Sequence, residues 1–330
     1  MNHTQAWCWH APGEPTQLTL ADLPLAPLAP DEVLVANRVI AFNPVDWKLI
    51  EYGHSNWQDG QVPGVDGMGT IVALGANVSH LRPGARVAYH TDLRHHGSFA
   101  RHTRVPARAL LPVPDALSDE AAAALPCPGL TAWQALAKLP RLHREALLIT
   151  GAGSSVGRFA VQLALKQGAR VFASASPRHH PWLKQIGVQG VADYRDSDWL
   201  AALQVANGNE PFEGIIDLVS SQQAESLLPA LGYYGHMVTV LGRIPHNPLP
   251  AFAHCHSLHE IALGAQHAFG TDKQWSRLVA AGVAMMEQMA SGELTLPPLV
   301  VGDFEALPTL LERFKREGQG EKFLVRVAER

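Results

Sequence analysis

The stretch "ALLITGAGSSVGRFAVQLA", residues 146–164, decides the fold of this 330-residue chain. A short apolar run leads into a glycine turn, and apolar residues three or four apart follow, which predicts a buried strand, a tight turn and a helix. Small residues in such a turn let a pyrophosphate approach the backbone at the helix N-terminus. The spacing of Gly151, Gly153 and Gly157 differs from the commonest dinucleotide fingerprint, so the strand–turn–helix context carries the prediction. The alternative is a turn that packs helix on sheet and binds nothing. The predicted phosphate-binding residues are Gly151, Gly153, Ser154, Ser155, Val156 and Gly157.

The region after this helix predicts the kind of nucleotide. Proteins that bind NAD usually carry an acidic residue about 20 residues beyond the glycine turn, where it binds the ribose 2′-hydroxyl. Between Arg158 and Ala192 the chain has neither Asp nor Glu. After the next predicted strand come Ser176 and Arg178, whose hydroxyl and guanidinium suit a 2′-phosphate. We therefore expect NADP(H). The alternative is that Arg178 is an ordinary solvated loop cation.

The pattern of strands and helices predicts two domains. Up to about Leu125, short β-branched runs such as Glu32–Phe42 and Gly69–Gly75 are separated by Gly and Pro, which is typical of a barrel or a folded sheet. Beyond that point, apolar strands alternate with helical segments, which predicts βαβ units and a doubly wound parallel sheet in an α/β protein. Such sheets bind ligands at the carboxyl ends of their strands. The further cofactor-binding residues expected there are Tyr194, Val219, Leu241 and Gly242.

The composition excludes several classes of protein. A net charge of −4 without a basic cluster argues against nucleic acid as a partner. No apolar run reaches the roughly 18 residues of a membrane span, and the N-terminal stretch lacks a signal-peptide pattern. The scattered Cys8, Cys127 and Cys255 argue against a disulfide framework and favour a reducing compartment. We expect a cytoplasmic protein that acts on a small molecule and has no membrane partner.

Several motifs occur in order along nearly the whole chain: "FNPVDWK" (42–48), "VPGVDGMGTIVALG" (62–75), "RPGARVAYH" (82–90), "GSFARH" (97–102), "LPCPGLTAWQAL" (125–136) and "TGAGSSVG" (150–157). This series resembles the medium-chain dehydrogenase/reductase superfamily, and most of all its zinc-independent quinone-oxidoreductase branch. The resemblance implies a GroES-like β-rich catalytic domain from residues 1–125 and 266–330. It also implies a Rossmann NADP(H)-binding domain from residues 126–265, an active site in the cleft between them, and a homodimer. The tail "GEKF" (320–323) departs from the family's frequent Arg-Gly-Lys.

The resemblance also bears on metal binding. In the zinc alcohol dehydrogenases of the superfamily, the stretch that corresponds to residues 63–75 contains Gly-His-Glu, and its histidine binds catalytic zinc. Val65 stands in that place here, Asn43 stands where the family has its first cysteine ligand, and only Cys127 keeps a ligand type. Because a catalytic zinc needs about three protein ligands, we expect no zinc. Two histidine pairs lack a convergent third ligand and are weak metal candidates: His95–His96 and His254–His256.

Without zinc as a Lewis acid, a conjugated acceptor is favoured over a simple ketone as the substrate. When hydride adds to a conjugated acceptor, the negative charge spreads onto an oxygen that hydrogen-bond donors can stabilise. The resemblance implies transfer of a hydride from NADPH to a small electrophile, either a quinone or an α,β-unsaturated carbonyl. The alternatives are a zinc-free alcohol or aldehyde dehydrogenase, an enoyl reductase on another substrate, and an NADPH-binding protein with vestigial activity.

The matched motifs indicate the residues that act. Asn43 is expected to face the nicotinamide or the substrate, although a turn amide is an equal alternative. Tyr89 and His90 follow a strand and are expected to border the cleft, with His90 as oxyanion donor or proton source; a loop histidine without a catalytic role is the alternative. Thr131 is expected beside the nicotinamide, or else as a helix-start hydroxyl. Asp46 is expected to tie loops together.

Overall fold

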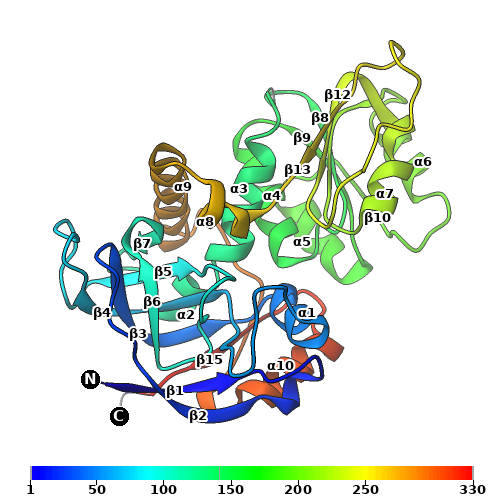
Figure 1. The fold of residues 1–330 in the computed structure, drawn as a ribbon. Coiled ribbons are helices and arrows are strands. Elements are labelled where there is room, and N and C mark those ends of the chain that lie inside the picture. Colours follow the sequence, from blue (N-terminus) through cyan, green and yellow to red (C-terminus); the bar gives the residue numbers. More distant parts are fainter. Residues whose placement is uncertain (1, 141, 329–330) are drawn as a thin grey trace. The chain divides into compact units, whose positions relative to one another are not determined.

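A computed structural model describes residues 2–140 and 142–328 of the chain (Figure 1). The chain divides into two compact units. The split unit joins Met1–Cys127 to Gly264–Arg330, and the central unit is Pro128–Leu263. Both ends of the chain therefore build one unit. None of the helices in the described ranges is long and apolar enough to cross a membrane.

The split unit is built on a seven-stranded sheet in which the two ends of the chain meet. Its strands are β3 (Glu32–Ala41), β4 (Asp66–Leu74), β5 (Arg86–His90), β6 (His102–Pro106), β7 (Leu110–Pro112), β14 (Leu299–Asp303) and β15 (Lys322–Arg326). The order is β14-β15-β3-β4-β5-β7, and β6 also pairs with β3. The red β15 lies beside the blue β3 in Figure 1, because the two strands pair antiparallel. A separate hairpin joins β1 (His3–Cys8) to β2 (Thr19–Pro24).

Five helices belong to the split unit: α1 (Pro44–Tyr52), α2 (Asp119–Ala123), α8 (Gln266–Phe269), α9 (Asp272–Ala290) and α10 (Leu307–Glu317). Aromatic side chains from distant parts of the chain form its core. Phe42 packs edge-on against Phe99 with ring centroids 5.7 Å apart, and Phe323 of β15 packs against Phe314 of α10. This burial fixes β15 against the start of α1, where the polar residues described below gather.

The central unit contains a six-stranded sheet in the order β10-β9-β8-β11-β12-β13, and all neighbouring strands run parallel. The strands are β8 (Ala146–Ile149), β9 (Arg170–Ser174), β10 (Gly190–Ala192), β11 (Phe212–Asp217), β12 (Leu231–Thr239) and β13 (Ser257–Glu260). The chain order reverses between β8 and β11, which is the switch point of a doubly wound sheet. The predicted α/β fold with a parallel Rossmann-type sheet is thereby confirmed.

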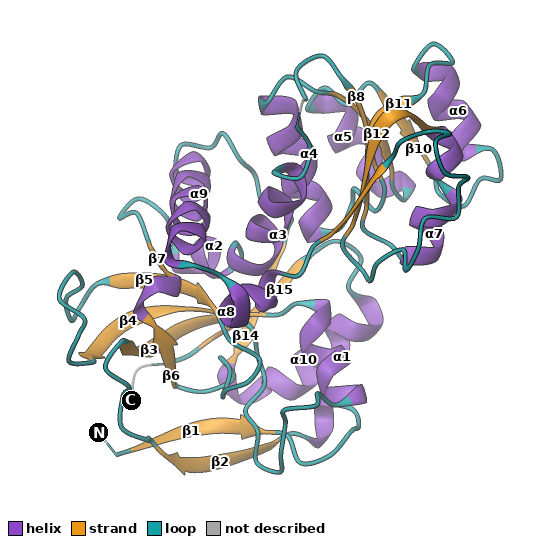
Figure 2. Cartoon of the chain, turned by 45° about the horizontal axis from the view of Figure 1, so that its top comes forward, coloured by secondary structure: helices purple, strands orange, loops and turns teal. Residues whose placement is uncertain are grey.

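Helices cover both faces of this sheet (Figure 2). They are α4 (Ser155–Lys166), α5 (His180–Gln185), α6 (Trp199–Ala206) and α7 (Ser221–Ser226). Apolar side chains at helical spacing, such as Phe159 and Leu163, bury one side of α4. Because both faces are covered, the inner strands β8 and β9 are apolar between their ends, whereas β12 and β13 also carry His236 and His259.

Candidate active site

The glycine turn joins β8 to α4 at the carboxyl edge of the parallel sheet. Gly151 has a φ of 63°, which favours glycine, and a Cβ on Gly157 would lie 2.4 Å from the carbonyl oxygen of Gly151. Ser154 caps α4, because its hydroxyl accepts from the N–H of Gly157 at 3.1 Å. The N–H groups of Ser155 and Val156 lie in the first turn, which has no intrahelical acceptor for them. The structure thus presents free N–H donors where the sequence predicts a phosphate.

The end of β9 lies beside this turn. A Cβ on Gly153 would lie 2.2 Å from the His179 ring, so the glycine turn contacts the 3-10 turn that follows β9. Ser176 precedes that 3-10 turn, and Arg178 lies within it with its side chain exposed. Tyr194, 54% exposed, follows the neighbouring β10. The structure therefore brings the predicted hydroxyl, guanidinium and phenol to one edge.

Asp217 forms hydrogen bonds at the same edge and was not among the residues predicted from the sequence. Its buried carboxylate accepts from the Thr150 hydroxyl at 2.6 Å. The other oxygen accepts from the N–H groups of Val219 and Ser220 at 3.1 and 2.9 Å, which fixes the turn after β11. Val219 is 46% exposed in that turn. The signal was present in the sequence, since Asp217 is the one acid within the otherwise apolar run Gly214–Val219.

Three further predicted cofactor residues lie in the central unit. Leu241 and Gly242 follow β12, so they share the carboxyl edge with the glycine turn, and Leu241 is 44% exposed. Gly242 has a φ of 87°. Thr131 lies within the helix α3 (Pro126–Leu136), with its side chain buried. The sheet therefore brings Leu241 and Gly242 to the turn but does not itself position Thr131.

A second set of polar residues lies in the split unit, and we call it the polar cluster. Its members are Asn43, Asp66, His90 and Lys322, which are buried, and Cys127, which is partly buried. Each stands at the end of an element. Asn43 precedes α1, Asp66 begins β4, and Lys322 begins β15. His90 ends β5 directly opposite Asp66 in the antiparallel register. Cys127 lies at the start of α3.

Asp66 is the centre of the polar cluster and is fully buried. One carboxylate oxygen lies 3.0 Å from Nδ1 of His90, and the other accepts from the side-chain amide of Asn43 at 2.9 Å. The backbone N–H of Cys127 donates to both oxygens at 3.0 Å. A buried carboxylate needs such donors, because each unsatisfied oxygen would be costly in an apolar interior.

Asn43 is engaged at both ends of its side chain. Its amide donates to Asp66, and its Oδ1 accepts from the ammonium of Lys322 at 2.7 Å. Its backbone N–H donates to Asp46 at 2.6 Å. With 3% of its surface exposed, Asn43 holds the cluster together. These contacts make Asn43 a positioning residue within the cluster, and its expected contact with nicotinamide or substrate stays a prediction.

Burial shifts the pKa of two groups around Asn43. Burial raises the pKa of Asp46 to about 8, although the N–H groups of Asn43 and Val65 both donate to its carboxylate. Burial lowers the pKa of Lys322, while the nearby Asp66 opposes this shift. Asp46 ties the start of α1 to the start of β4, which agrees with its expected role as a loop tie.

His90 is the titratable side chain of the cluster that is suited to proton transfer. Its Nδ1 faces Asp66, so the carboxylate holds the Nδ1–H tautomer and leaves Nε2 to carry or accept a proton. The carbonyl oxygen of His90 accepts from Nε2 of His267 at 3.0 Å, and the two rings stack with centroids 6.4 Å apart. These contacts fix both the backbone and the ring of His90.

Tyr89, which was expected to border the cleft together with His90, does not join the polar cluster. Its ring is fully buried, and its hydroxyl donates to Oδ1 of Asn37 at 2.6 Å. Burial raises the pKa of this phenol well above its ordinary value. Successive side chains of a strand point to opposite faces, so Tyr89 and His90 of β5 face opposite ways.

The described residues contain one group of metal-ligating side chains, made of Asp66, His90 and Cys127, whose ligand atoms lie within 4.8 Å of one another. From the sequence, only Cys127 was expected to keep a ligand type, because Asp66 and His90 do not stand at the family's ligand positions. The donor types suit zinc. However, the Lys322 ammonium lies 3.9 Å from Asp66, and both Asp66 oxygens already accept hydrogen bonds. This setting disagrees with a bound dication.

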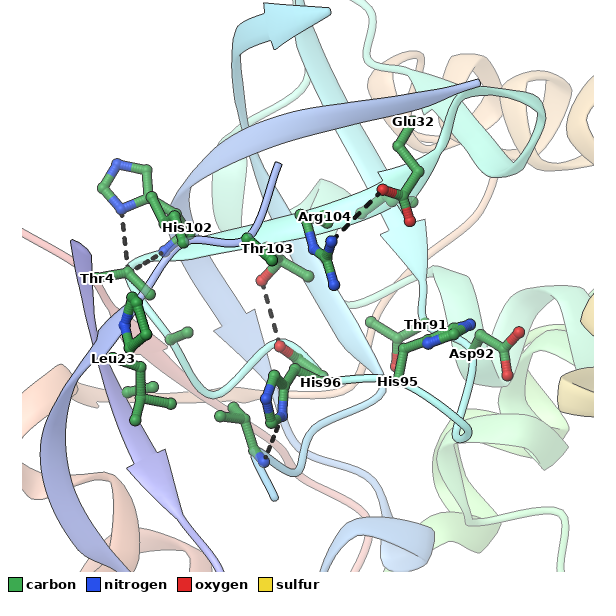
Figure 3. A pocket seen from close by; sticks show the side chains of 18 of the residues that line it. Thr4, Leu23, Glu32, Thr91, Asp92, His95, His96, His102, Thr103 and Arg104 are labelled. Carbon is green, nitrogen blue, oxygen red and sulfur yellow. Dashed lines mark hydrogen bonds and ion pairs between the residues drawn. The ribbon is translucent and has the colours of Figure 1, made fainter. Parts of the chain in front are cut away.

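The two histidine pairs noted in the sequence form no such group within the described residues. His254 and His256 have ring centroids 5.2 Å apart. His95 and His96 line a pocket of about 180 Å³ beside β1 and β6 (Figure 3). There, Nδ1 of His96 accepts from the N–H of Val62 at 3.1 Å, so that nitrogen serves the fold.

Comparison with known proteins identifies relatives for both units. Residues 29–115 match the family described as the alcohol dehydrogenase GroES-like domain. The trans-enoyl reductase tazE of Aspergillus terreus is 35% identical over 192 residues, which cover 51% of this chain and 62% of that protein. The trans-enoyl reductase thnE of Trichoderma harzianum is 32% identical over 243 residues, covering 67% and 65%. The chain spans less than two thirds of the length of these relatives.

Solved structures match along the whole chain. The quinone oxidoreductase from Coxiella burnetii superposes with a TM-score of 0.82 at 21% identity, covering 99% of this chain and 100% of that one. The CurK enoyl reductase superposes with a TM-score of 0.81 at 19% identity, covering 98% and 99%. At these identities, the likeness establishes the fold. The GroES-like match, the parallel sheet and these likenesses confirm the predicted resemblance to the medium-chain dehydrogenase/reductase superfamily.

Proposed function

We propose that this protein is an NADPH-dependent reductase of a carbon–carbon double bond conjugated to a carbonyl, and that it works without a metal. The observation that carries the proposal is the buried Asp66–His90 pair, with His90 Nδ1 held 3.0 Å from the carboxylate. Reduction of such a bond needs one hydride and one proton. The pair is suited to the proton, because a histidine oriented by a carboxylate is an effective general acid.

The carboxyl edge of the central unit fits NADPH. The turn from Gly151 to Gly157 offers N–H donors to the pyrophosphate, and bound NADPH supplies the hydride. Ser176 and the exposed Arg178 would hold the 2′-phosphate. The acidic residue that NAD-binding proteins usually carry after the second strand is missing, because the chain has no Asp or Glu between Arg158 and Ala192.

The polar cluster supplies what the reaction needs besides the cofactor. His90 Nε2 would donate to the substrate carbonyl oxygen and then give a proton to the reduced product. Asp66 keeps the ring in one tautomer and stabilises the imidazolium that forms between turnovers. Asn43 and Cys127 hold Asp66 in place through hydrogen bonds of 2.9 and 3.0 Å.

The relatives support an enoyl group as the substrate class. Two fungal relatives at 35% and 32% identity are named trans-enoyl reductases. An enoyl carbonyl contains the conjugated double bond that a hydride and a proton reduce. A quinone is the second candidate, supported by the likeness to a quinone oxidoreductase.

A substrate panel tests this function. We expect the protein to oxidise NADPH with an α,β-unsaturated ketone or an enoyl thioester in metal-free buffer, and to do so faster than with a quinone or a simple aldehyde. The quinone being the best acceptor would support the second candidate. Tight NADPH binding without turnover on any acceptor would contradict both.

We also propose that the protein is a homodimer that pairs through β13. This strand is at the edge of the central sheet and pairs with β12 alone, so its outer backbone groups are open to a second strand. Light scattering on the eluting protein would report the mass, and a monomer at micromolar concentration would contradict the proposal.

A further inference from the structure

Lys322 is a fully buried lysine that the proposed reaction does not use. Its side chain has 2% of its surface exposed. The ammonium donates to the carbonyl oxygen of Phe42 at 3.0 Å and to Oδ1 of Asn43 at 2.7 Å. A buried charge is costly unless an opposite charge and hydrogen bonds compensate it. The presence of the buried Lys322 ammonium in the polar cluster therefore needs an explanation.

The compensating charge is Asp66, whose Oδ2 lies 3.9 Å from the ammonium. Asp66 is also one of the three residues whose ligand atoms lie within 4.8 Å of one another, with His90 and Cys127. One carboxylate therefore faces both a lysine ammonium and a set of atoms that suits a divalent metal. A divalent metal bound to these atoms and the Lys322 ammonium would therefore share Asp66 as their counter-charge.

We propose that Lys322 is the resident cation of the polar cluster, where its ammonium balances Asp66 and excludes a divalent metal from Asp66, His90 and Cys127. The inference rests on the metal-free part of the proposed function. It makes Lys322 a positioning residue, because the ammonium acts on the site through Asn43 and Asp66. The replacement of the family's zinc ligands by Asn43 and Val65 is then only part of the reason why we expect no metal.

The geometry supports competition between the two cations. A zinc ion bound to Oδ2 of Asp66 at about 2.2 Å would lie within about 6 Å of the Lys322 ammonium. Like charges at that separation repel strongly in a buried, poorly screened site. The metal would also displace the hydrogen bonds that Asp66 accepts from Asn43 and Cys127. Removal of the ammonium leaves Asp66 in need of a cation.

Titration with Co²⁺ tests the exclusion, because a cobalt–thiolate bond has a near-ultraviolet charge-transfer band. We expect the wild type to show no such band. Lys322→Met keeps the buried stem without the charge, and we expect it to bind one Co²⁺ at least about 100-fold more tightly than the wild type, with the band. Adding Cys127→Ser to this variant is expected to abolish the band. Lys315→Met, which removes an ammonium paired with Glu14, is the matched control and is expected to behave as the wild type.

Two results would overturn the inference: a wild type that binds Co²⁺ with the thiolate band as tightly as Lys322→Met, or a folded Lys322→Met that gains no binding. If Lys322→Met does not fold, Lys322→Gln keeps neutral donors for Phe42 and Asn43 and carries the same expectation. Metal binding is read without substrate, so its outcome is separate from turnover. A wild type that excludes Co²⁺ but reduces no acceptor would count against the proposed function alone.

Discussion

At the scale of single residues, the chemistry of this protein depends on how a few buried side chains restrict one another. Asp66 accepts three kinds of donor, and each donor is thereby held in one orientation. His90 is fixed at Nδ1 by Asp66 and at its carbonyl oxygen by His267. The site thus presents one ring nitrogen, Nε2, in a defined position. Such pre-organisation is what proton transfer requires.

His90→Asn is expected to lower kcat for an enone by about 100-fold or more, because a general acid contributes that much to proton transfer. NADPH affinity, measured by fluorescence titration, should stay the same, since His90 is not among the predicted cofactor-binding residues. Tyr89→Phe alters the neighbouring residue on the opposite face of β5 and is expected to retain the wild-type rate. Equal losses in the two variants would show that β5 only supports the fold.

Arg178→Ala is expected to weaken NADPH binding by about 10- to 100-fold and to leave NADH binding nearly unchanged, since a charge-assisted phosphate contact is lost. Dissociation constants for both cofactors measure this. Arg195→Ala is the matched control, because Arg195 is exposed near the same edge but pairs with Asp193 at 2.7 Å. A loss shared equally by NADPH and NADH would contradict the 2′-phosphate assignment.

Residue patterns predicted some of these features and not others. The Gly151–Gly157 turn was predictable because its glycines and its flanking periodicity are local. The contact between Asn43 and Lys322 was not, since 279 positions separate them and only the pairing of β15 with β3 joins them. The alternation of side chains along a strand places Tyr89 and His90 on opposite faces of the sheet. It does not predict which of the two faces carries polar partners.

At the scale of elements, short helices and strand ends position the site. The four-residue α8 is attached to β5 by the hydrogen bond from His267 to the His90 carbonyl oxygen. His267 also packs against Trp275 of α9, with ring centroids 4.8 Å apart. Each unit has a group of polar residues at its strand ends: the polar cluster in the split unit, and Thr150 with Asp217 in the central unit.

Burial of His267 makes the stability of the protein depend on pH. Burial lowers the pKa of His267 to about 4, whereas the unfolded residue titrates near 6.5. The unfolded chain therefore takes up a proton first, so this stabilisation is complete above pH 6.5 and is lost as the pH falls towards 4. The loss amounts to about 2 to 3 kcal/mol.

Urea denaturation of the wild type and His267→Gln between pH 7 and pH 4.5 measures this effect. The free energy of unfolding should fall more steeply with decreasing pH in the wild type than in the variant, which has no imidazole to protonate. Parallel curves would contradict the prediction.

At the scale of the whole molecule, the α/β class followed from sequence because strand and helix periods change sharply near Leu125. The order β10-β9-β8-β11-β12-β13 follows from right-handed βαβ crossovers with one reversal. By contrast, the return of the chain to the first sheet through β14 and β15 came only from the family resemblance. Long-range antiparallel pairing has no local signal, so the residues that it unites were found only in the structure.

Exhaustive treatment with a chelator is expected to leave NADPH oxidation unchanged, because Lys322 already balances the charge of Asp66. Elemental analysis of the purified protein should show less than one zinc per chain. Loss of activity that added zinc restores would contradict a metal-free reaction.

The pairing of β15 with β3 also sets an order of events during synthesis. The central unit is one continuous segment, Pro128–Leu263, so it can fold while the ribosome is still translating the rest. The first sheet stays incomplete until β15 emerges, because β3 has β4 and β6 as partners but lacks β15, and Asn43 lacks the Lys322 ammonium. Before β15 is synthesised, the incomplete sheet has an open edge at β3. A chaperone would therefore be needed at these amino-terminal strands.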